Sequence, residues 1–125
     1  MSNPVNDLLT VYEEHGTIIV GVDFDDTIFP YNKRSKTQCE TVREVLLQAR
    51  PYITICLYTI ADEQSLKYKL ALMEMWGLTP DYVNESPVKM SGPKPYFNLL
   101  LDDKAGLFEA TSTLRKFKNM INEIN

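Results

Sequence analysis

Two kinds of hydrophobic pattern alternate along the chain. Nearly continuous apolar runs, which are typical of strands buried on both faces, cover residues 17–22, 52–58 and 99–101. The last of these lies in a strand expected over residues 97–101, and a short strand is expected over residues 81–83. Elsewhere apolar residues recur at every third or fourth position, which predicts amphipathic helices. These helices are expected over residues 6–15, 37–50 and 62–76, and over a C-terminal segment that reaches residue 124.

Residues that start or stop helices support these boundaries. Gly16 follows the first helical segment, at the position where a left-handed turn costs least. Thr37 and Asp62 precede the second and third helical patterns and are expected to cap them. Pro51 ends the second helix, and Gly77 ends the third.

Buried strands that alternate with helices predict an α/β fold. We expect a single Rossmann-like domain over residues 1–125, with a parallel sheet and helices on both of its faces. Right-handed crossovers then place the carboxyl ends of all strands at one edge of the sheet. Ligands bind at this edge in such folds, near the point where the strand order reverses.

Composition narrows the classes of function. The 125 residues carry a net charge of −4 and no stripe of Lys and Arg, which argues against a general nucleic-acid binder. Cys39 and Cys56 lack the spacing of zinc ligands and are expected to be free thiols in a reducing compartment. No apolar run approaches the roughly 18 residues of a membrane span, and the N-terminus lacks a signal-peptide pattern. We therefore expect a cytoplasmic protein.

Carboxylates follow two of the predicted strands. Asp23 and Asp25 come after the first strand, and Asp102 and Asp103 come after the last. Two such charges about 4 Å apart repel by roughly 4 kcal/mol at an effective dielectric constant of 20, so the group needs a cation. Oxygen ligands favour Mg²⁺, which commonly shares its coordination shell with a phosphate. The implied substrate is a phosphorylated molecule.

The alternation of side chains along a strand indicates which acids reach the site. Asp23 and Asp25 lie two positions apart, so both reach one site, whereas Asp26 points away. One of the two acids can act as a nucleophile and the other as a proton donor and acceptor. The hydroxyl of Thr59, at the end of the second long strand, and a lysine ammonium can bind the remaining phosphate oxygens.

The chain resembles the haloacid dehalogenase superfamily, whose members are mostly magnesium-dependent phosphohydrolases. Residues 18–28 resemble its first motif, an apolar strand followed by Asp-x-Asp-x-Thr that here ends in Thr27. Residues 53–59 resemble the second motif, a strand that ends in Thr, and residues 99–103 resemble the fourth, a strand that ends in two acids. The third motif is a single lysine, for which Lys94 and Lys89 are candidates. Lys94 is preferred because it lies just before the last strand.

The resemblance implies a phosphatase that acts through an aspartyl-phosphate intermediate. Asp23 would be the nucleophile, and Asp25 would protonate the leaving oxygen and then activate water. Mg²⁺ would be held by the side chain of Asp23, the backbone carbonyl of Asp25 and the side chain of Asp103, with Asp102 in support. Thr59 and Lys94 would bind the phosphate, and Thr27 would support the first motif.

The intervals between the motifs are too short for the cap domain that many relatives carry. The expected substrate is a small phosphometabolite or a nucleotide. An uncapped site also suits a large substrate, such as a phosphoprotein or the end of a nucleic acid, unless a second copy of the chain supplies the lid. Phe29 and Tyr31 occupy the place of the family's flap. They either stack on a substrate ring or pack on their own loop.

Two other functions compete with the phosphatase. A phosphoacceptor receiver domain also has acids, a Thr and a Lys at strand ends, but its acceptor Asp follows the third strand. Here Asn84 follows the third predicted strand. A non-catalytic protein that binds phosphate is the other alternative, although both catalytic acids of the family are present.

Overall fold

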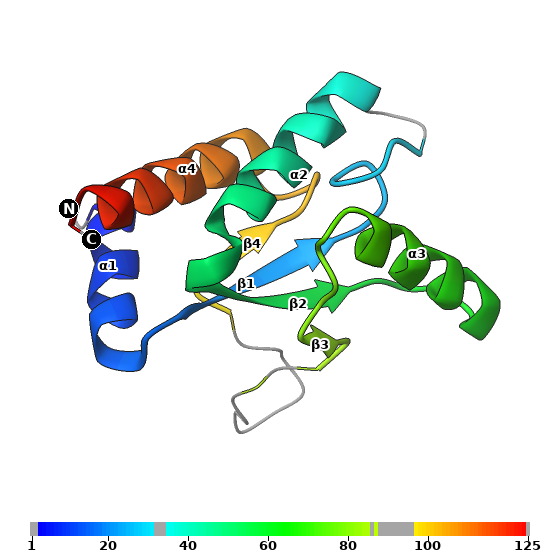
Figure 1. The fold of residues 1–125 in the computed structure, drawn as a ribbon. Helices are drawn as coiled ribbons and strands as arrows, with labels where there is room; N and C mark the ends of the chain where they lie inside the picture. Colours follow the sequence, from blue (N-terminus) through cyan, green and yellow to red (C-terminus); the bar gives the residue numbers. More distant parts are fainter. Residues whose placement is uncertain (1–2, 32–34, 86, 88–96, 125) are drawn as a thin grey trace.

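The structure is a computed structural model that describes residues 3–31, 35–85, 87 and 97–124. Strands β1 (Ile18–Asp23), β2 (Ile53–Tyr58), β3 (Tyr82–Val83) and β4 (Leu99–Leu101) form a parallel sheet in the order β3-β2-β1-β4. Helices α1 (Pro4–His15), α2 (Lys36–Ala49), α3 (Glu63–Met75) and α4 (Leu107–Ile124) flank it (Figure 1). The predicted Rossmann-like α/β fold with a parallel sheet is thus confirmed.

The helix boundaries follow from local side-chain chemistry. Asp62 caps α3 as predicted, because its side chain accepts a hydrogen bond from the backbone N–H of Ser65. The prediction that Thr37 caps α2 was wrong. The cap is Ser35, which exchanges side-chain and backbone hydrogen bonds with Gln38 in a capping box and so starts the helix at Lys36.

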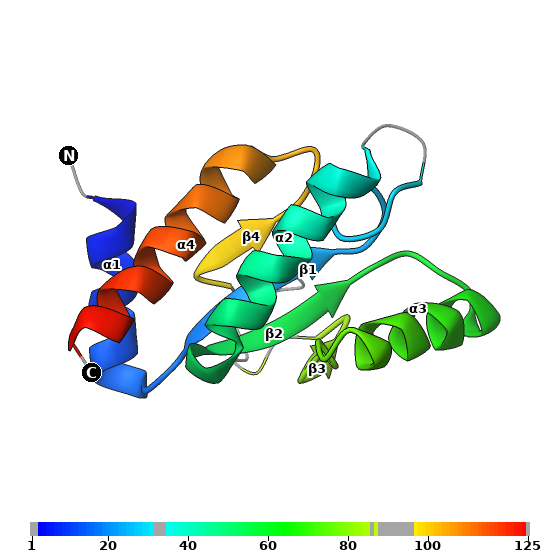
Figure 2. The ribbon, with the colours of Figure 1, turned by 45° about the horizontal axis from the view of Figure 1, so that its top comes forward.

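One face of the sheet is covered by α2 and α4, which lie side by side above it (Figure 2). Inward-facing positions recur at every second residue of each strand, as the pleat requires. The buried side chains on this face form a continuous core with α2, α4 and the first turns of α1: Val5, Leu8, Ile18, Val20, Val22, Val42, Leu46, Ile53, Ile55, Leu57, Leu101, Leu114 and Phe117. This packing fixes the strand ends that carry the candidate site.

The opposite face of β1 carries Gly21, and an aromatic ring fills the space that its missing side chain leaves. The ring of Phe97 lies so close that a Cβ atom built on Gly21 would be 2.8 Å from its Cδ1. The same ring packs against Tyr58 of β2, with centroids 5.6 Å apart. Phe97, two residues before β4, therefore packs on this face of the sheet.

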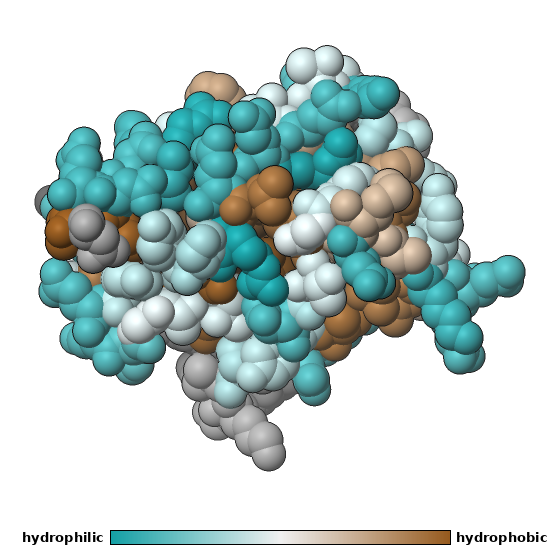
Figure 3. Space-filling view, in the orientation of Figure 1, coloured by the Kyte–Doolittle hydropathy of each residue, from teal (hydrophilic) through white to brown (hydrophobic). Residues whose placement is uncertain are grey.

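The surface is polar over most of the face shown in Figure 3, where hydrophilic residues cover α2 and α4 and hydrophobic residues form small separate patches. Within the described ranges, no helix is long and apolar enough to cross a membrane.

The contact between Gly21 and Phe97 yields a stability prediction. We expect Gly21→Ala to lower the free energy of unfolding by about 1–3 kcal/mol, because the added methyl group would overlap the Phe97 ring and force that ring to shift. Urea denaturation measures this loss. The same substitution in a Phe97→Ala background should cost little, since the clash is then gone. An equal loss in both backgrounds would contradict the proposed contact.

Candidate active site

The site lies where the strand order of the sheet reverses. The chain passes from β1 to β2 and β3 on one side and then returns to β4 on the other side of β1. Val22 pairs in register with Leu101, so the residues that follow them, Asp23 and Asp102, leave the sheet side by side. Parallel pairing of β1 and β4 therefore brings together acids that are far apart in the sequence.

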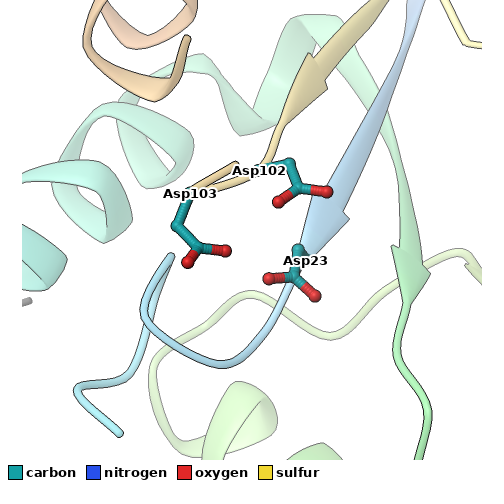
Figure 4. A group of neighbouring side chains, drawn as sticks. All are labelled: Asp23, Asp102 and Asp103. Atoms are coloured by element: carbon teal, nitrogen blue, oxygen red, sulfur yellow. The ribbon is translucent and has the colours of Figure 1, made fainter. Parts of the chain in front are cut away.

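Three carboxylates converge at this point. One oxygen from each of Asp23, Asp102 and Asp103 lies within 4.8 Å of the others. Figure 4 shows the three side chains turned toward a common space between the end of β1 and the turn after β4. Carboxylate oxygens at this spacing can act together as ligands of a hard divalent cation.

Backbone and hydroxyl donors fix the acids in place. Thr27 donates its hydroxyl proton to Oδ2 of Asp23 over 3.2 Å and accepts the backbone N–H of Asp103 over 3.0 Å. The backbone N–H of Lys104 donates to Oδ1 of Asp102 over 3.0 Å. Thr27, which is fully buried, thus joins the turn after β1 to the turn after β4.

Burial and neighbouring charges raise the pKa of Asp23 from 3.8 to about 6. Loss of hydration is the largest cause, and the negative charge of Asp102 is the next. The hydrogen bond from Thr27 opposes the shift but does not cancel it. A bound cation would offset both effects, so the donor set fits a divalent metal ion.

The turn after β1 is shaped by Asp26, whose backbone is left-handed with φ of 59°. Asp tolerates this conformation better than most residues. The backbone N–H of Asp26 donates to the carbonyl of Phe29 over 2.8 Å, and its carboxylate accepts the N–H of Tyr31 over 3.0 Å. Asp26 is buried, and these bonds give it a structural part in holding the turn that carries Asp25.

A lysine that the sequence analysis did not select lies beside Asp25 and Thr59. Lys69 of α3 donates from Nζ to Oγ1 of Thr59 over 2.8 Å, and its Nζ is 3.4 Å from Oδ2 of Asp25. Only 11% of the Lys69 side chain is exposed, so its charge acts in a partly dehydrated setting. The ammonium group and the Thr59 hydroxyl form a pair of donors next to the acids.

A stack of aromatic rings holds α3 against the turn after β1. The rings of Phe24, Phe29 and Trp76 pack nearly parallel, with centroids 5.8–6.1 Å apart. The Nζ of Lys69 lies 5.2 Å from the centroid of Phe24, and Cζ of Arg43 lies 4.2 Å from that of Trp76. Phe29 therefore packs on its own loop, which was one of the two alternatives for this flap.

The two lysines proposed from the sequence, Lys94 and Lys89, lie outside the described residues. A signal for Lys69 was nevertheless present in the sequence. Lys69 falls between Leu66 and Met73 at helical spacing, on the side of α3 that packs inward. A lysine within an apolar stripe has to find a partner, and such a residue is a candidate for function.

The cleft over the acids is open and has a volume of about 340 Å³. It is lined by Asp23, Asp25, Asp26, Tyr31, Thr59, Ile60, Asp102, Asp103 and Lys104. A larger cavity of about 940 Å³ lies toward the amino ends of β1 and β2, where Thr17 and Thr54 line it. We assign the site to the smaller cleft, because it contains the acid cluster and lies at the edge where parallel sheets bind ligands.

Comparison with known proteins adds no family assignment. Neither the protein-family models, nor the curated proteins, nor the solved structures that were searched gave a match to this chain.

The raised pKa of Asp23 predicts how stability depends on pH when no metal is present. The folded state holds this proton more tightly than the unfolded chain does, so Asp23 contributes stability below about pH 4 and loses that contribution as the pH rises through 6. Asn at this position has no such dependence. We expect Asp23→Asn to gain thermal stability relative to the wild type between pH 4 and pH 7.5, in the presence of a chelator.

Glu44→Gln is the matched control, because Glu44 is an exposed carboxylate on α2, away from the cluster. This variant measures the effect of removing a surface carboxylate, and the gain of Asp23→Asn is evaluated relative to it. A pH-independent difference for Asp23→Asn would show that Asp23 has no raised pKa.

Proposed function

We propose that the protein is a magnesium-dependent phosphomonoesterase that acts through an aspartyl-phosphate intermediate. One observation carries the proposal: the acid cluster of Asp23, Asp102 and Asp103 shares a cleft with Thr59, whose hydroxyl accepts a hydrogen bond from Lys69 of α3. Acids that suit a metal ion and donors that suit phosphate oxygens are the two halves of a site for phosphoryl transfer.

The residues present fit a role for Mg²⁺. Its ligands would be the carboxylates of Asp23 and Asp103 and the backbone carbonyl of Asp25, with Asp102 close enough to support or share the coordination. When bound, Mg²⁺ neutralises charge on the phosphate and on the attacking carboxylate. Because the ligands must be ionised, metal binding also keeps Asp23 deprotonated at neutral pH.

The proposed reaction has two displacements at phosphorus. The Asp23 carboxylate attacks phosphorus, the bond from phosphorus to the leaving oxygen breaks, and Asp25 gives its proton to that oxygen. Asp25 then takes a proton from water, the water oxygen attacks phosphorus, and the bond to Asp23 breaks to release inorganic phosphate. These roles rest on the resemblance of residues 18–28 to the haloacid dehalogenase motif.

In this proposal Lys69 is the lysine that binds the phosphate, in place of Lys94 or Lys89. Its contact with Thr59 at 2.8 Å places an ammonium and a hydroxyl where one phosphate could accept hydrogen bonds from both. Its distance of 3.4 Å from Asp25 also places it beside the proposed proton donor. We therefore assign the phosphate-binding lysine to Lys69.

The small volume of the cleft favours a small phosphorylated substrate. In the described part of the chain, α2 and β2 follow the first motif, and α3 and β3 follow Thr59, with no cap domain in either interval. The volume of about 340 Å³ lies at the lower end of the range for small-molecule sites. A phosphometabolite or nucleotide of modest size is the proposed class of substrate.

The receiver-domain alternative is not favoured, because the residue directly after the third strand is not an acid. Asn84, and not an Asp, follows β3, and its side-chain oxygen accepts the backbone N–H of Thr59 over 2.9 Å. Lys104 follows the last strand and lines the cleft, where a receiver has its lysine, but the lysine that contacts Asp25 and Thr59 comes from α3. A non-catalytic phosphate binder would have no use for Asp25 beside Lys69.

Release of phosphate from 4-nitrophenyl phosphate tests the proposal. We expect activity that requires Mg²⁺ and is abolished in Asp23→Asn, because the amide cannot attack phosphorus. Lys69→Met should lower kcat/KM by about 10²–10³-fold, the usual loss when one donor to a developing negative charge is removed.

Lys67→Met is the matched control for Lys69. Lys67 lies on the same helix but is exposed and pairs with Glu63 at 3.7 Å. This variant should keep wild-type activity. Full activity in Asp23→Asn, or equal losses in the two lysine variants, would refute the assigned roles.

A further inference from the structure

Two large apolar side chains stand exposed at the mouth of the candidate active site. Tyr31 is 71% exposed and Ile60 is fully exposed, and both line the same cleft as the acids. Single exposed apolar residues are common on protein surfaces. These two both line one charged cleft, so the cleft combines exposed apolar surface with a polar centre, which is the usual make-up of a small-molecule site.

The backbone beneath both side chains is anchored to the site. The N–H of Tyr31 donates to the carboxylate of the buried Asp26 over 3.0 Å. Ile60 directly follows Thr59, whose N–H donates to the side chain of Asn84 over 2.9 Å. The backbone at Tyr31 and next to Ile60 is thus held by hydrogen bonds near the proposed phosphate-binding residues, while both side chains remain in contact with water.

The geometry points to a phosphomonoester whose leaving group carries a planar apolar ring, held between or against Tyr31 and Ile60. This inference rests on the proposed phosphatase function and names its class of substrate. A phosphate bound at Thr59 and Lys69 projects its leaving group out of the polar centre and toward the rim. A ring there would cover apolar surface on both side chains, and a Tyr ring also favours stacking on another ring.

The size of the effect follows from the area of surface that the ring would bury. Removing about 60 Å² of apolar surface from water corresponds to a roughly tenfold gain in affinity. If the same contact persists in the transition state, the gain appears in kcat/KM.

Benzyl phosphate and ethyl phosphate form a suitable pair of probes. Both leave as simple primary alcohols, so their intrinsic reactivities are similar, and they differ chiefly in the ring. For the wild type with Mg²⁺ we expect kcat/KM to be about tenfold or more higher for benzyl phosphate. Tyr31→Ala and Ile60→Ala should each lower this ratio, and the double variant should bring it close to one.

Tyr68→Ala is the matched control. Tyr68 is also exposed, at 61%, but it lies on α3 and does not line the cleft. Its ratio of the two kcat/KM values should equal that of the wild type. Tyr31→Phe, which keeps the ring, should retain most of the preference.

The outcomes test the ring preference and the phosphatase function separately. If the wild type hydrolyses both esters with equal kcat/KM, the ring preference is wrong and the phosphatase function stands. If the double variant keeps a high wild-type ratio, the assignment of ring binding to Tyr31 and Ile60 is wrong and the phosphatase function again stands. If the wild type hydrolyses neither ester in the presence of Mg²⁺, the phosphatase function fails and the substrate class fails with it.

Discussion

The pairing of β1 with β4 is the constraint on which the candidate site depends. Their parallel register places Val22 opposite Leu101, so that Asp23 and Asp102 leave the sheet as neighbours and Asp103 follows at once. The same packing that buries the apolar strands therefore forces like charges together. The cost is visible in the pKa of Asp23, which burial and Asp102 raise to about 6. A fold that maintains such repulsion is suited to binding a cation.

Positive charge reaches the site from α3, on the other side of β1. Lys69 is held by its bond to Thr59 and lies over the ring of Phe24. Phe24 in turn stacks with Trp76, one residue after the end of α3, so the strand end and the helix are tied together by rings. Because Phe24 lies between Asp23 and Asp25 in the sequence, its burial turns its two acidic neighbours toward the cleft. The hydrophobic core and the polar site are thus positioned by the same residue.

Much of this arrangement could be predicted from sequence, because buried parallel strands leave long apolar runs and their carboxyl ends must share an edge. The acids at positions 23, 102 and 103 are brought together as that rule requires. Lys69 was missed because motif spacing directs attention to strand ends, whereas this lysine reaches the site from within a helix. Thr37 was the predicted cap of α2, whereas the cap is Ser35. Both hydroxyls have a capping-box partner three residues later, Gln38 for Ser35 and Glu40 for Thr37, so the sequence pattern does not choose between them.

A crystal structure with Mg²⁺ and a fluoride mimic of the phosphoryl group, such as beryllium fluoride, would test the central claim most directly. The account predicts the metal ion at about 2.0–2.1 Å from oxygens of Asp23 and of the Asp102–Asp103 pair. It also predicts the mimic on Asp23, within hydrogen-bond distance of Nζ of Lys69 and Oγ1 of Thr59. A mimic bound to another residue, or a metal ion outside the acid cluster, would contradict it.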